Sequence, residues 1–276
     1  MIHPEQIAGA DSEEVPLKNR LRRQFRDGQT TYGLWVTAET PTITEAAVAL
    51  GLDWVVIDME HGHQDFHEVM NHLRVVRGSD TSAVVRVPAI EMSAVKRALD
   101  MGAHGVIVPY AQSHEDVERA FTYGRFPPRG VRGVCGDRAV RWGLRFREYL
   151  TEADEETLII PLIETRGAVE DIDAILGIEG LEAIFFGPAD MSASYGFLGE
   201  WEGPGVAERI LDARARAEAR GISAGLMTRS VADSVLRRDQ GFRMIGLGAD
   251  MSLLIRAIRE HLKALDCDRP IDLESW

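Results

Sequence analysis

Cysteine, long apolar runs and an export signal are scarce or missing in this sequence of 276 residues. Its two cysteines, Cys135 and Cys267, lack Cys-x-x-Cys spacing, which excludes a disulfide framework and a thiolate zinc cluster. No uninterrupted apolar run approaches the roughly 20 residues of a membrane span. The first residues, MIHPEQIAGADSEE, lack the basic and apolar regions of a secretory signal. We therefore expect a cytoplasmic protein that makes no membrane contact.

Positive charge is also in short supply. The formal net charge is −13 and the isoelectric point is near 5.1, so nucleic acids and anionic membranes would be repelled at long range. Small molecules and other proteins remain as partners. The lysines are Lys18, Lys96 and Lys263, and each falls on a predicted helix. A Schiff-base reaction, which would need a lysine at a strand end, is therefore disfavoured.

The sequence does contain a regular alternation of strand-like and helix-like segments. Short β-rich runs cover residues 32–37, 53–59, 83–87, 105–109, 158–163, 182–187, 222–226 and 244–247. Most are continuously apolar, as is typical of parallel strands buried on both faces. Segments of helical periodicity lie between them, at 42–51, 65–78, 93–102, 117–124, 205–221 and 230–241. This pattern predicts a single (β/α)8 TIM barrel of the α/β class. An open doubly wound sheet is less favoured, because no GxGxxG motif follows the first strand.

The ends of the chain and one internal segment break this rhythm. We expect an N-terminal extension at 1–30, containing a solvated or interface helix that ends near Gly28, then the barrel at 31–266 and a C-terminal tail at 267–276. The segment 125–157 is long, rich in glycine and proline at first and then strongly basic. Long segments of this kind are often functional. Its arginines indicate either an anion-binding or subunit-contact role, or a solvated basic helix that pairs with acidic neighbours.

Acidic residues close several of the apolar runs. Glu164 ends the run LIIPLIE, Asp190 follows IFFGPA, and the DMEH motif at 58–61 follows DWVVI. In a parallel barrel the carboxyl ends of the strands converge on one mouth, so these carboxylates predict a site for a divalent cation. Oxygen ligands favour a hard or borderline cation such as Mg²⁺, Mn²⁺ or Co²⁺, without deciding among them.

Two further residues at predicted strand ends suit acid–base and anion chemistry. His61 begins the loop after the second strand, and Asp58 or Asp100 is a candidate to orient its imidazole as a general base. Arg86 lies in the apolar run VVRVP, where an unpaired guanidinium would be costly. It is therefore expected either to face an anionic ligand at the mouth or to bridge acids inside the barrel. Backbone N–H groups of the turn from Gly187 to Asp190 are candidates to receive a substrate carboxylate.

Together these segments resemble one known family over nearly the whole chain, from about residue 32 to 265. The stretches GLW, GLDWVVIDMEH, VVRVP, GVIVPYAQSHEDVERA, FPPRGVRG, LIIPLIETRGAVEDI, GPADMSASYG and GLGADMSLL look like those of the HpcH/HpaI aldolases. The resemblance implies class II, metal-dependent pyruvate aldolases, including 4-hydroxy-2-oxo-heptane-1,7-dioate and 2-dehydro-3-deoxyglucarate aldolases. Such proteins are (β/α)8 barrels that usually assemble as homohexamers.

The match also implies roles for individual residues. His61 would be the catalytic proton acceptor, Arg86 would stabilise the enolate oxygen and bind substrate, and Asp100 would raise the basicity of the histidine. Glu164 and Asp190 would be the two metal ligands.

Substrate contacts follow from the same match. Ala189 would bind substrate through its backbone beside Gly187, and Trp35 would line the mouth. Leu162 stands where hydroxy-heptanedioate members carry a substrate-binding glutamine, so this chain loses an amide and its acceptor is expected to differ.

The reaction expected from this match is reversible cleavage of 4-hydroxy-2-oxo acids to pyruvate and a small aldehyde through a metal-bound pyruvate enolate. Alternatives within enzymes are decarboxylation of oxaloacetate and cleavage of an acyl-CoA like that of citrate-lyase β subunits. A different class of function is a non-catalytic barrel that binds 2-oxo acids, because fold alone does not establish activity.

Overall fold

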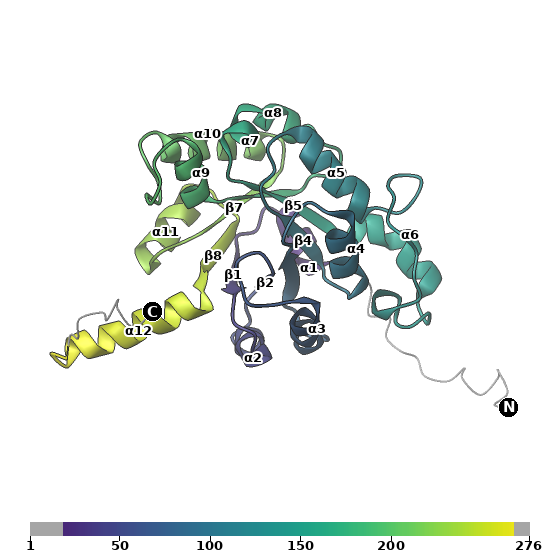
Figure 1. Cartoon of the computed structure of the whole chain (residues 1–276), viewed down its shortest axis with the longest axis horizontal. Coiled ribbons are helices and arrows are strands. Elements are labelled where there is room, and N and C mark those ends of the chain that lie inside the picture. Colours follow the sequence, from purple (N-terminus) through teal and green to yellow (C-terminus); the bar gives the residue numbers. More distant parts are fainter. Residues whose placement is uncertain (1–18, 268–276) are drawn as a thin grey trace.

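The computed structural model describes residues 19–267 and contains a closed barrel of parallel strands (Figure 1). The strands follow one another around the barrel in sequence order. They are β1 Thr31–Val36, β2 Trp54–Asp58, β3 Ser82–Arg86, β4 Gly105–Val108, β5 Leu158–Ile163, β6 Ala183–Phe186, β7 Ser223–Met227 and β8 Met244–Ala249. The predicted (β/α)8 fold is confirmed, with strand boundaries shifted by one or two residues.

Helices cover the outside of the barrel. They are α1 Arg20–Arg26, α2 Pro41–Ala49, α3 Phe66–Val75, α4 Met92–Asp100, α5 His114–Gly124, α6 Phe146–Glu156, α7 Arg166–Glu170, α8 Ile172–Ile175, α9 Pro188–Ser194, α10 Val206–Ala219, α11 Val231–Asp239 and α12 Asp250–Ala264. A short 3-10 helix, η2 Arg138–Val140, lies between α5 and α6. We call the carboxyl ends of the strands the mouth of the barrel and the amino ends its lower end.

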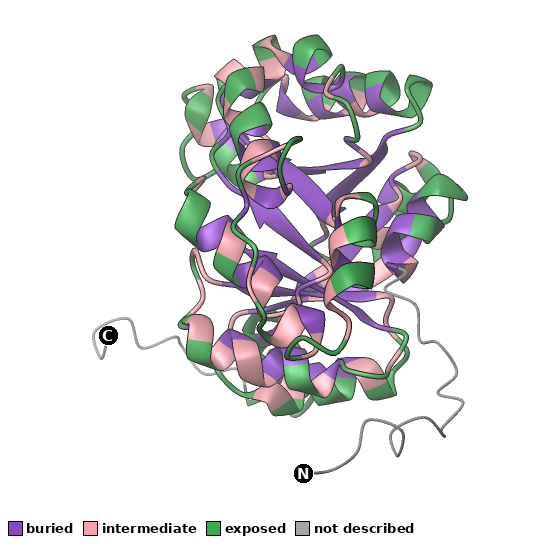
Figure 2. Ribbon diagram, turned by 90° about the vertical axis from the view of Figure 1, so that its right-hand side faces the viewer, coloured by how far each residue is buried: buried purple, intermediate pink, exposed green. Residues whose placement is uncertain are grey.

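Strands β2 to β6 are buried on both faces, and the sheet forms the centre of the molecule (Figure 2). Inside the barrel, Trp54 packs edge-on against Phe185, with 6.4 Å between the ring centroids. Gly33 of β1 lies beside Trp54 of β2. A Cβ atom on this glycine would lie 2.1 Å from the indole ring of Trp54. The glycine therefore makes room for the largest side chain of the barrel interior.

The lower end of the barrel is closed by α1. Leu21 and Phe25 are 0% and 3% exposed and belong to the same apolar cluster as Trp54 and Phe185. Asn19 caps the helix and donates its side-chain amide to the main-chain oxygen of His104, just before β4. The sequence predicted a solvated or interface helix, and the structure shows that one face of α1 is buried, which makes it part of the barrel core. The first 18 residues of the predicted extension lie outside the described part, as do residues 268–276 of the predicted tail.

The last helix differs from the others because it extends away from the barrel beside β8 (Figure 1). Asp250 fixes its start at the mouth: the carboxylate accepts hydrogen bonds from the backbone N–H groups of Thr37 and Ala38 at 3.0 and 2.9 Å. Beyond this residue α12 is largely exposed. Within residues 19–267, no helix is both long and apolar enough to span a bilayer, and both cysteines are free.

Candidate active site

Acidic side chains gather at the mouth, as the strand-end pattern predicted. Glu164 follows β5, Asp190 lies in the first turn of α9 after β6, and Glu60 follows β2. Glu60 and Asp190 both raise the pKa of Glu164, which places the three carboxylates within electrostatic reach of one another. Mutual repulsion of this kind is relieved by a cation, so the donor set fits a divalent metal ion.

Glu164 is the most perturbed carboxyl of this group. It is 4% exposed, and burial, together with the charges of Glu60 and Asp190, raises its pKa to about 7. One carboxylate oxygen, Oε1, accepts the backbone N–H of Tyr110 at 2.6 Å. The other, Oε2, faces Gly187, where a Cβ would lie only 2.8 Å away. Gly187 therefore leaves the space that this carboxylate occupies.

Asp58, at the end of β2, holds the guanidinium of Arg86 from β3. Its Oδ1 accepts a hydrogen bond from Arg86 Nε at 2.8 Å, and its Oδ2 pairs with Arg86 Nη2. The indole Nε1 of Trp35 donates to the same Oδ2 at 3.1 Å. Burial opposes ionisation of Asp58, but the hydrogen bond and charge of Arg86 prevail and lower the pKa of this carboxyl. Asp58 is thus a fixed anion that orients two side chains from neighbouring strands.

Arg86 also forms an ion pair with Glu60, at 2.8 Å between Nη1 and Oε2. The sequence predicted that Arg86 would either face an anionic ligand or bridge acidic side chains. In the single chain its guanidinium bridges Asp58 and Glu60. Burial raises the pKa of Glu60 even though Arg86 opposes the shift. Because proton uptake by Glu60 would weaken its hold on the guanidinium, the Glu60 contact is the more easily exchanged of the two.

His61 lies at the mouth with its side chain exposed to solvent. Its backbone N–H donates to Asp58 Oδ1 at 3.3 Å, which ties the loop to the end of β2. The Asp58 carboxylate is occupied by Arg86, Trp35 and backbone N–H groups. Of the two acids proposed to orient the imidazole, Asp58 has no hydrogen bond with the His61 side chain within residues 19–267.

Asp100 lies far from His61 within one chain. It is the last residue of α4, which runs from the mouth back to the lower end before β4 begins. There its carboxylate accepts hydrogen bonds from the buried Arg132, at 3.2 Å from Nε and 2.9 Å from Nη2. No hydrogen bond or ion pair joins it to His61 among residues 19–267. The implied pairing of these two residues is not formed inside a single copy.

The expected substrate contacts divide into exposed and buried residues. Ala189 is exposed at the first turn of α9. The N–H of Gly187 is already donated to the Ile163 oxygen at 3.2 Å, so this glycine serves the site through its lack of a side chain. Leu162 and Trp35 are each 3% exposed and pack in the barrel interior beneath the carboxylates. They form the floor of the site instead of its open wall.

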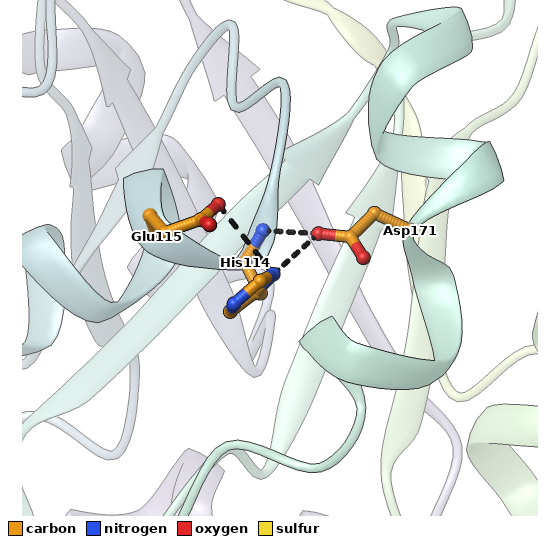
Figure 3. A group of neighbouring side chains, drawn as sticks. All are labelled: His114, Glu115 and Asp171. Atoms are coloured by element: carbon orange, nitrogen blue, oxygen red, sulfur yellow. Dashed lines mark hydrogen bonds and ion pairs between the residues drawn. The ribbon is translucent and has the colours of Figure 1, made fainter.

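A second group of metal-ligand types lies outside the strand-end acids, and the sequence pattern gave no signal for it. The side chains of His114, Glu115 and Asp171 meet between α5 and the junction of α7 and α8 (Figure 3). Asp171 Oδ2 lies 2.6 Å from the backbone nitrogen of His114 and 2.7 Å from its Nδ1. This hydrogen bond raises the pKa of His114. Because protonation competes with metal binding, the group is better described as an ion pair that links these helices.

Comparison with known proteins gives a consistent result. The family model described as HpcH/HpaI aldolase/citrate lyase matches residues 31–257. The 4-hydroxy-2-oxovalerate aldolase of Rhodococcus jostii is 35% identical over 86% of this chain and 92% of its own length. The hydroxypyruvate/pyruvate aldolase of Paraburkholderia phytofirmans is 34% identical over 90% and 96%. A crystal structure of an HpcH/HpaI aldolase/citrate lyase family protein from Burkholderia cenocepacia superposes with a TM-score of 0.86 at 35% identity, covering 90% of this chain and all of that one.

Proposed function

The chain belongs to the HpcH/HpaI aldolase/citrate lyase family and is an aldolase, a carbon–carbon lyase, and on this basis we propose that it cleaves 4-hydroxy-2-oxo acids reversibly to pyruvate and a small aldehyde. Relatives whose names specify 4-hydroxy-2-oxovalerate or pyruvate as substrate support this substrate class. The observation that carries the proposal is the carboxylate of Glu164 at the mouth: it is 4% exposed, is fixed by the Tyr110 N–H at 2.6 Å, and faces the space left by Gly187.

Glu164 and Asp190 would hold the cation, and Mg²⁺, Mn²⁺ and Co²⁺ all suit these oxygen donors. When bound, the cation supplies positive charge to the carboxylate and keto oxygens of the substrate. Gly187 keeps space beside Glu164 Oε2, and the Tyr110 N–H fixes the other oxygen of this carboxylate. A preformed, desolvated carboxylate of this kind gains most from a nearby positive charge.

Arg86 would donate to the substrate oxygen that becomes the enolate oxygen. Asp58 fixes the guanidinium through Nε and Nη2, which leaves Nη1, now paired with Glu60, as the group that turns to the substrate. Trp35 lies under the same guanidinium, 5.0 Å from its central carbon to the ring centroid. This positioning matters because a preorganised donor stabilises developing charge without reorganisation during the reaction.

His61 would act as the base. In the cleavage direction it takes the proton of the C4 hydroxyl, the C3–C4 bond breaks, and the electron pair passes to C3 of the pyruvate enolate while the aldehyde leaves. The proton now held by His61 passes to that carbon and gives pyruvate, and the reverse of this step would exchange the methyl protons of pyruvate. The exposed position of His61 at the mouth supports this role, because the acceptor aldehyde must enter and leave on that side.

The implied partner of His61, Asp100, would have to come from a second copy of the chain, because α4 carries it to the lower end of its own barrel. The proposal therefore includes a homo-oligomer. An unpaired apolar face supports it: Met251, Leu254, Ile255 and Ile258 on α12 are 44 to 52% exposed.

The barrel surface beside α12 is incompletely covered as well. Tyr32, Leu34 and Leu247, from β1 and β8, are only half-buried, whereas Val55 of β2, the register partner of Leu34, is fully buried. An Ile255→Glu variant is expected to lower the sedimentation mass relative to the wild type, while the exposed control Arg259→Glu leaves it unchanged. An unchanged mass in Ile255→Glu would exclude this face from the assembly, and the hexamer stays a prediction.

The test of the chemistry follows the methyl protons of pyruvate. EDTA-stripped protein is incubated with pyruvate in D₂O, with and without added Mg²⁺, Mn²⁺ or Co²⁺, and exchange is followed by NMR. We expect exchange only with metal, and a loss of at least about a hundredfold in His61→Ala, with the neighbouring His63→Ala as matched control. Exchange without metal would contradict the cation's role, and unchanged exchange in His61→Ala would remove this residue from the mechanism. Pyruvate release from 4-hydroxy-2-oxo acids, oxaloacetate and an acyl-CoA then defines the substrate.

A further inference from the structure

A cavity of about 420 Å³ lies at the lower end of the barrel, away from the strand-end acids. It is bounded by the turn before β3, the turn before β4 and the segment around η2, and the lining side chains include Arg77, His104, Arg138, Arg141, Trp142 and Tyr149. None of these residues takes part in the proposed aldol reaction. The cavity therefore requires a separate explanation.

Within residues 19–267, three of the arginines that line the cavity have no carboxylate partner. Arg138 donates through Nη2 to the Leu73 oxygen at 2.9 Å and through Nη1 to the Met101 oxygen, both of them main-chain carbonyls. Burial, and then the positive charges of Arg77 and Arg74, lower the pKa of Arg138. Within residues 19–267 no carboxylate pairs with Arg77, Arg138 or Arg141. A cluster of like charges is thus held together in a protein of net charge −13.

Other arginines of the basic segment behave differently. Arg129 pairs with Glu155 at 2.9 Å, Arg132 pairs with Asp100 at 2.9 Å, and Arg145 lies 3.7 Å from Glu148. The two acids that line the cavity are also engaged elsewhere: Asp80 forms an ion pair with Arg20, and Glu156 accepts a hydrogen bond from Asn19. The arginines of the basic segment therefore form two groups. One group makes ion pairs that stabilise the fold, and the other lines the cavity.

The turn after η2 holds an aromatic ring at the edge of this cavity. Arg141 and Trp142 both have left-handed backbone conformations, with φ of 50° and 54°. Hydrogen bonds fix the turn, from the Arg141 N–H to the Arg138 oxygen at 2.9 Å and from the Trp142 N–H to the Asp137 oxygen at 3.0 Å. The indole is nevertheless 62% exposed. The left-handed backbone conformation is costly for residues other than glycine. Because the turn adopts it while holding an exposed tryptophan beside arginines, it indicates a ligand contact.

We propose that this cavity binds the phosphate group of a small phosphorylated molecule, with Arg77, Arg138 and Arg141 as its ligands and Trp142 at its rim. Guanidinium groups match phosphate oxygens in pairs, and several positive charges in one place favour a multiply charged anion over a monocarboxylate. The exposed ring is suited to stack on a planar base, as in a nucleotide. Within one chain this cavity lies at the opposite end of the barrel from the mouth, where pyruvate chemistry is proposed.

The test uses isothermal titration of the full-length, metal-stripped protein in EDTA, so that the anion cannot bind through a metal at the mouth. Inorganic pyrophosphate is expected to bind, and Arg77→Gln/Arg141→Gln should weaken it by roughly tenfold or more. Arg147→Gln, in the same segment but outside the cavity lining, is the matched control and should bind like the wild type. Glu164→Gln should also bind normally, which would separate this site from the mouth. Thermal melts of the variants check that they are folded.

The outcomes are distinct. Absence of pyrophosphate binding to the wild type up to millimolar concentration, or equal binding by the double variant and the control, would overturn the proposal. A parallel titration with ADP identifies the source of the phosphate: ADP binding tighter than pyrophosphate, and reduced selectively in Trp142→Ala, assigns a nucleotide. Equal affinities in the wild type assign the inorganic anion. Neither result depends on aldol activity, so this inference and the proposed function can fail separately.

Discussion

The two ends of the barrel both concentrate charge, but with opposite sign and in different surroundings. At the mouth, Glu60 forms an ion pair with Arg86, and Glu164 lies within reach of the charges of Glu60, Asp190 and Arg86. At the lower end, Arg77, Arg138 and Arg141 face a cavity without a paired acid in the described chain. Glu60 and Glu164 follow the ends of buried strands, where burial raises the pKa of both carboxyls. The lower arginines come from turns, and one of these turns carries an exposed tryptophan.

The contrast is that carboxylates are concentrated at the mouth and arginines at the lower end, each on a different kind of structural element. Strand ends hold the mouth carboxylates rigidly, which suits chemistry that depends on fixed geometry. Turns at the lower end tolerate variation in length and sequence, which suits binding of a separate ligand. Substitutions at one end of a single barrel should therefore leave the function of the other end unchanged.

The largest expected effect comes from removing a mouth carboxylate. Glu164→Gln should reduce metal-dependent exchange of pyruvate protons by more than about a thousandfold, because it removes a ligand and leaves the cation too weakly held. Titration with Mn²⁺ should show the corresponding loss of metal affinity. Glu170→Gln, an exposed glutamate on the following helix, is the control and should behave like the wild type. Full activity of Glu164→Gln would remove this residue from the site.

A smaller loss, of about a hundred- to a thousandfold in exchange rate, is expected for Arg86→Lys. Lysine keeps the positive charge, but it lacks the planar fork that Asp58 holds through two nitrogens. The rate should fall at saturating pyruvate, and metal affinity measured by Mn²⁺ titration should change much less. A variant that loses metal affinity as strongly as Glu164→Gln would show that Arg86 supports the metal ligands instead of the substrate.

The contribution of α1, which closes the lower end of the barrel, can be tested by measuring protein stability. Phe25→Ala should lower the free energy of unfolding by about 3–5 kcal/mol, because a buried aromatic ring of the barrel core is lost. Arg23→Ala, on the exposed face of the same helix, should cost much less. Urea denaturation of both variants gives the comparison. Equal effects would mean that α1 adds little to the barrel core.

The pH dependence of metal binding should show the raised pKa of Glu164. Because this pKa is about 7 in the folded protein, metal affinity should fall by about tenfold for each pH unit below 7, as the ion must displace a proton. Titration with Mn²⁺ between pH 5.5 and 8.5 measures the slope. A flat profile down to pH 5.5 would place the pKa of Glu164 near its ordinary value.

The same group makes a prediction about stability without metal. Its folded-state pKa lies above the usual 4.5, so between about 4.5 and 7 the folded protein binds a proton that the unfolded chain has released. Stability of the metal-free protein should therefore fall as pH rises through this window. Urea denaturation in EDTA at several pH values should show the decline in the wild type and a weaker one in Glu164→Gln.

The sequence alone indicated the barrel and the placement of its acids. Apolar runs at regular intervals predicted the eight strands, and the runs ending at Glu164 and before Asp190 put carboxylates at the mouth. These inferences succeed because strand burial and side-chain alternation are local properties that repeat along the chain. The family resemblance was likewise carried by contiguous motifs, and the family match confirms it.

Only the tertiary structure decided which charges pair. Asp58 holds Arg86 across 28 positions of sequence and Asp100 holds Arg132 across 32, while Leu21 and Phe25 enter the barrel from outside the predicted barrel segment. The arginines at the lower end that have no carboxylate partner within residues 19–267 look like the paired ones in sequence. Pairing depends on the distance between side chains after the barrel closes, and that distance is set by strand register and helix direction, which no local pattern encodes.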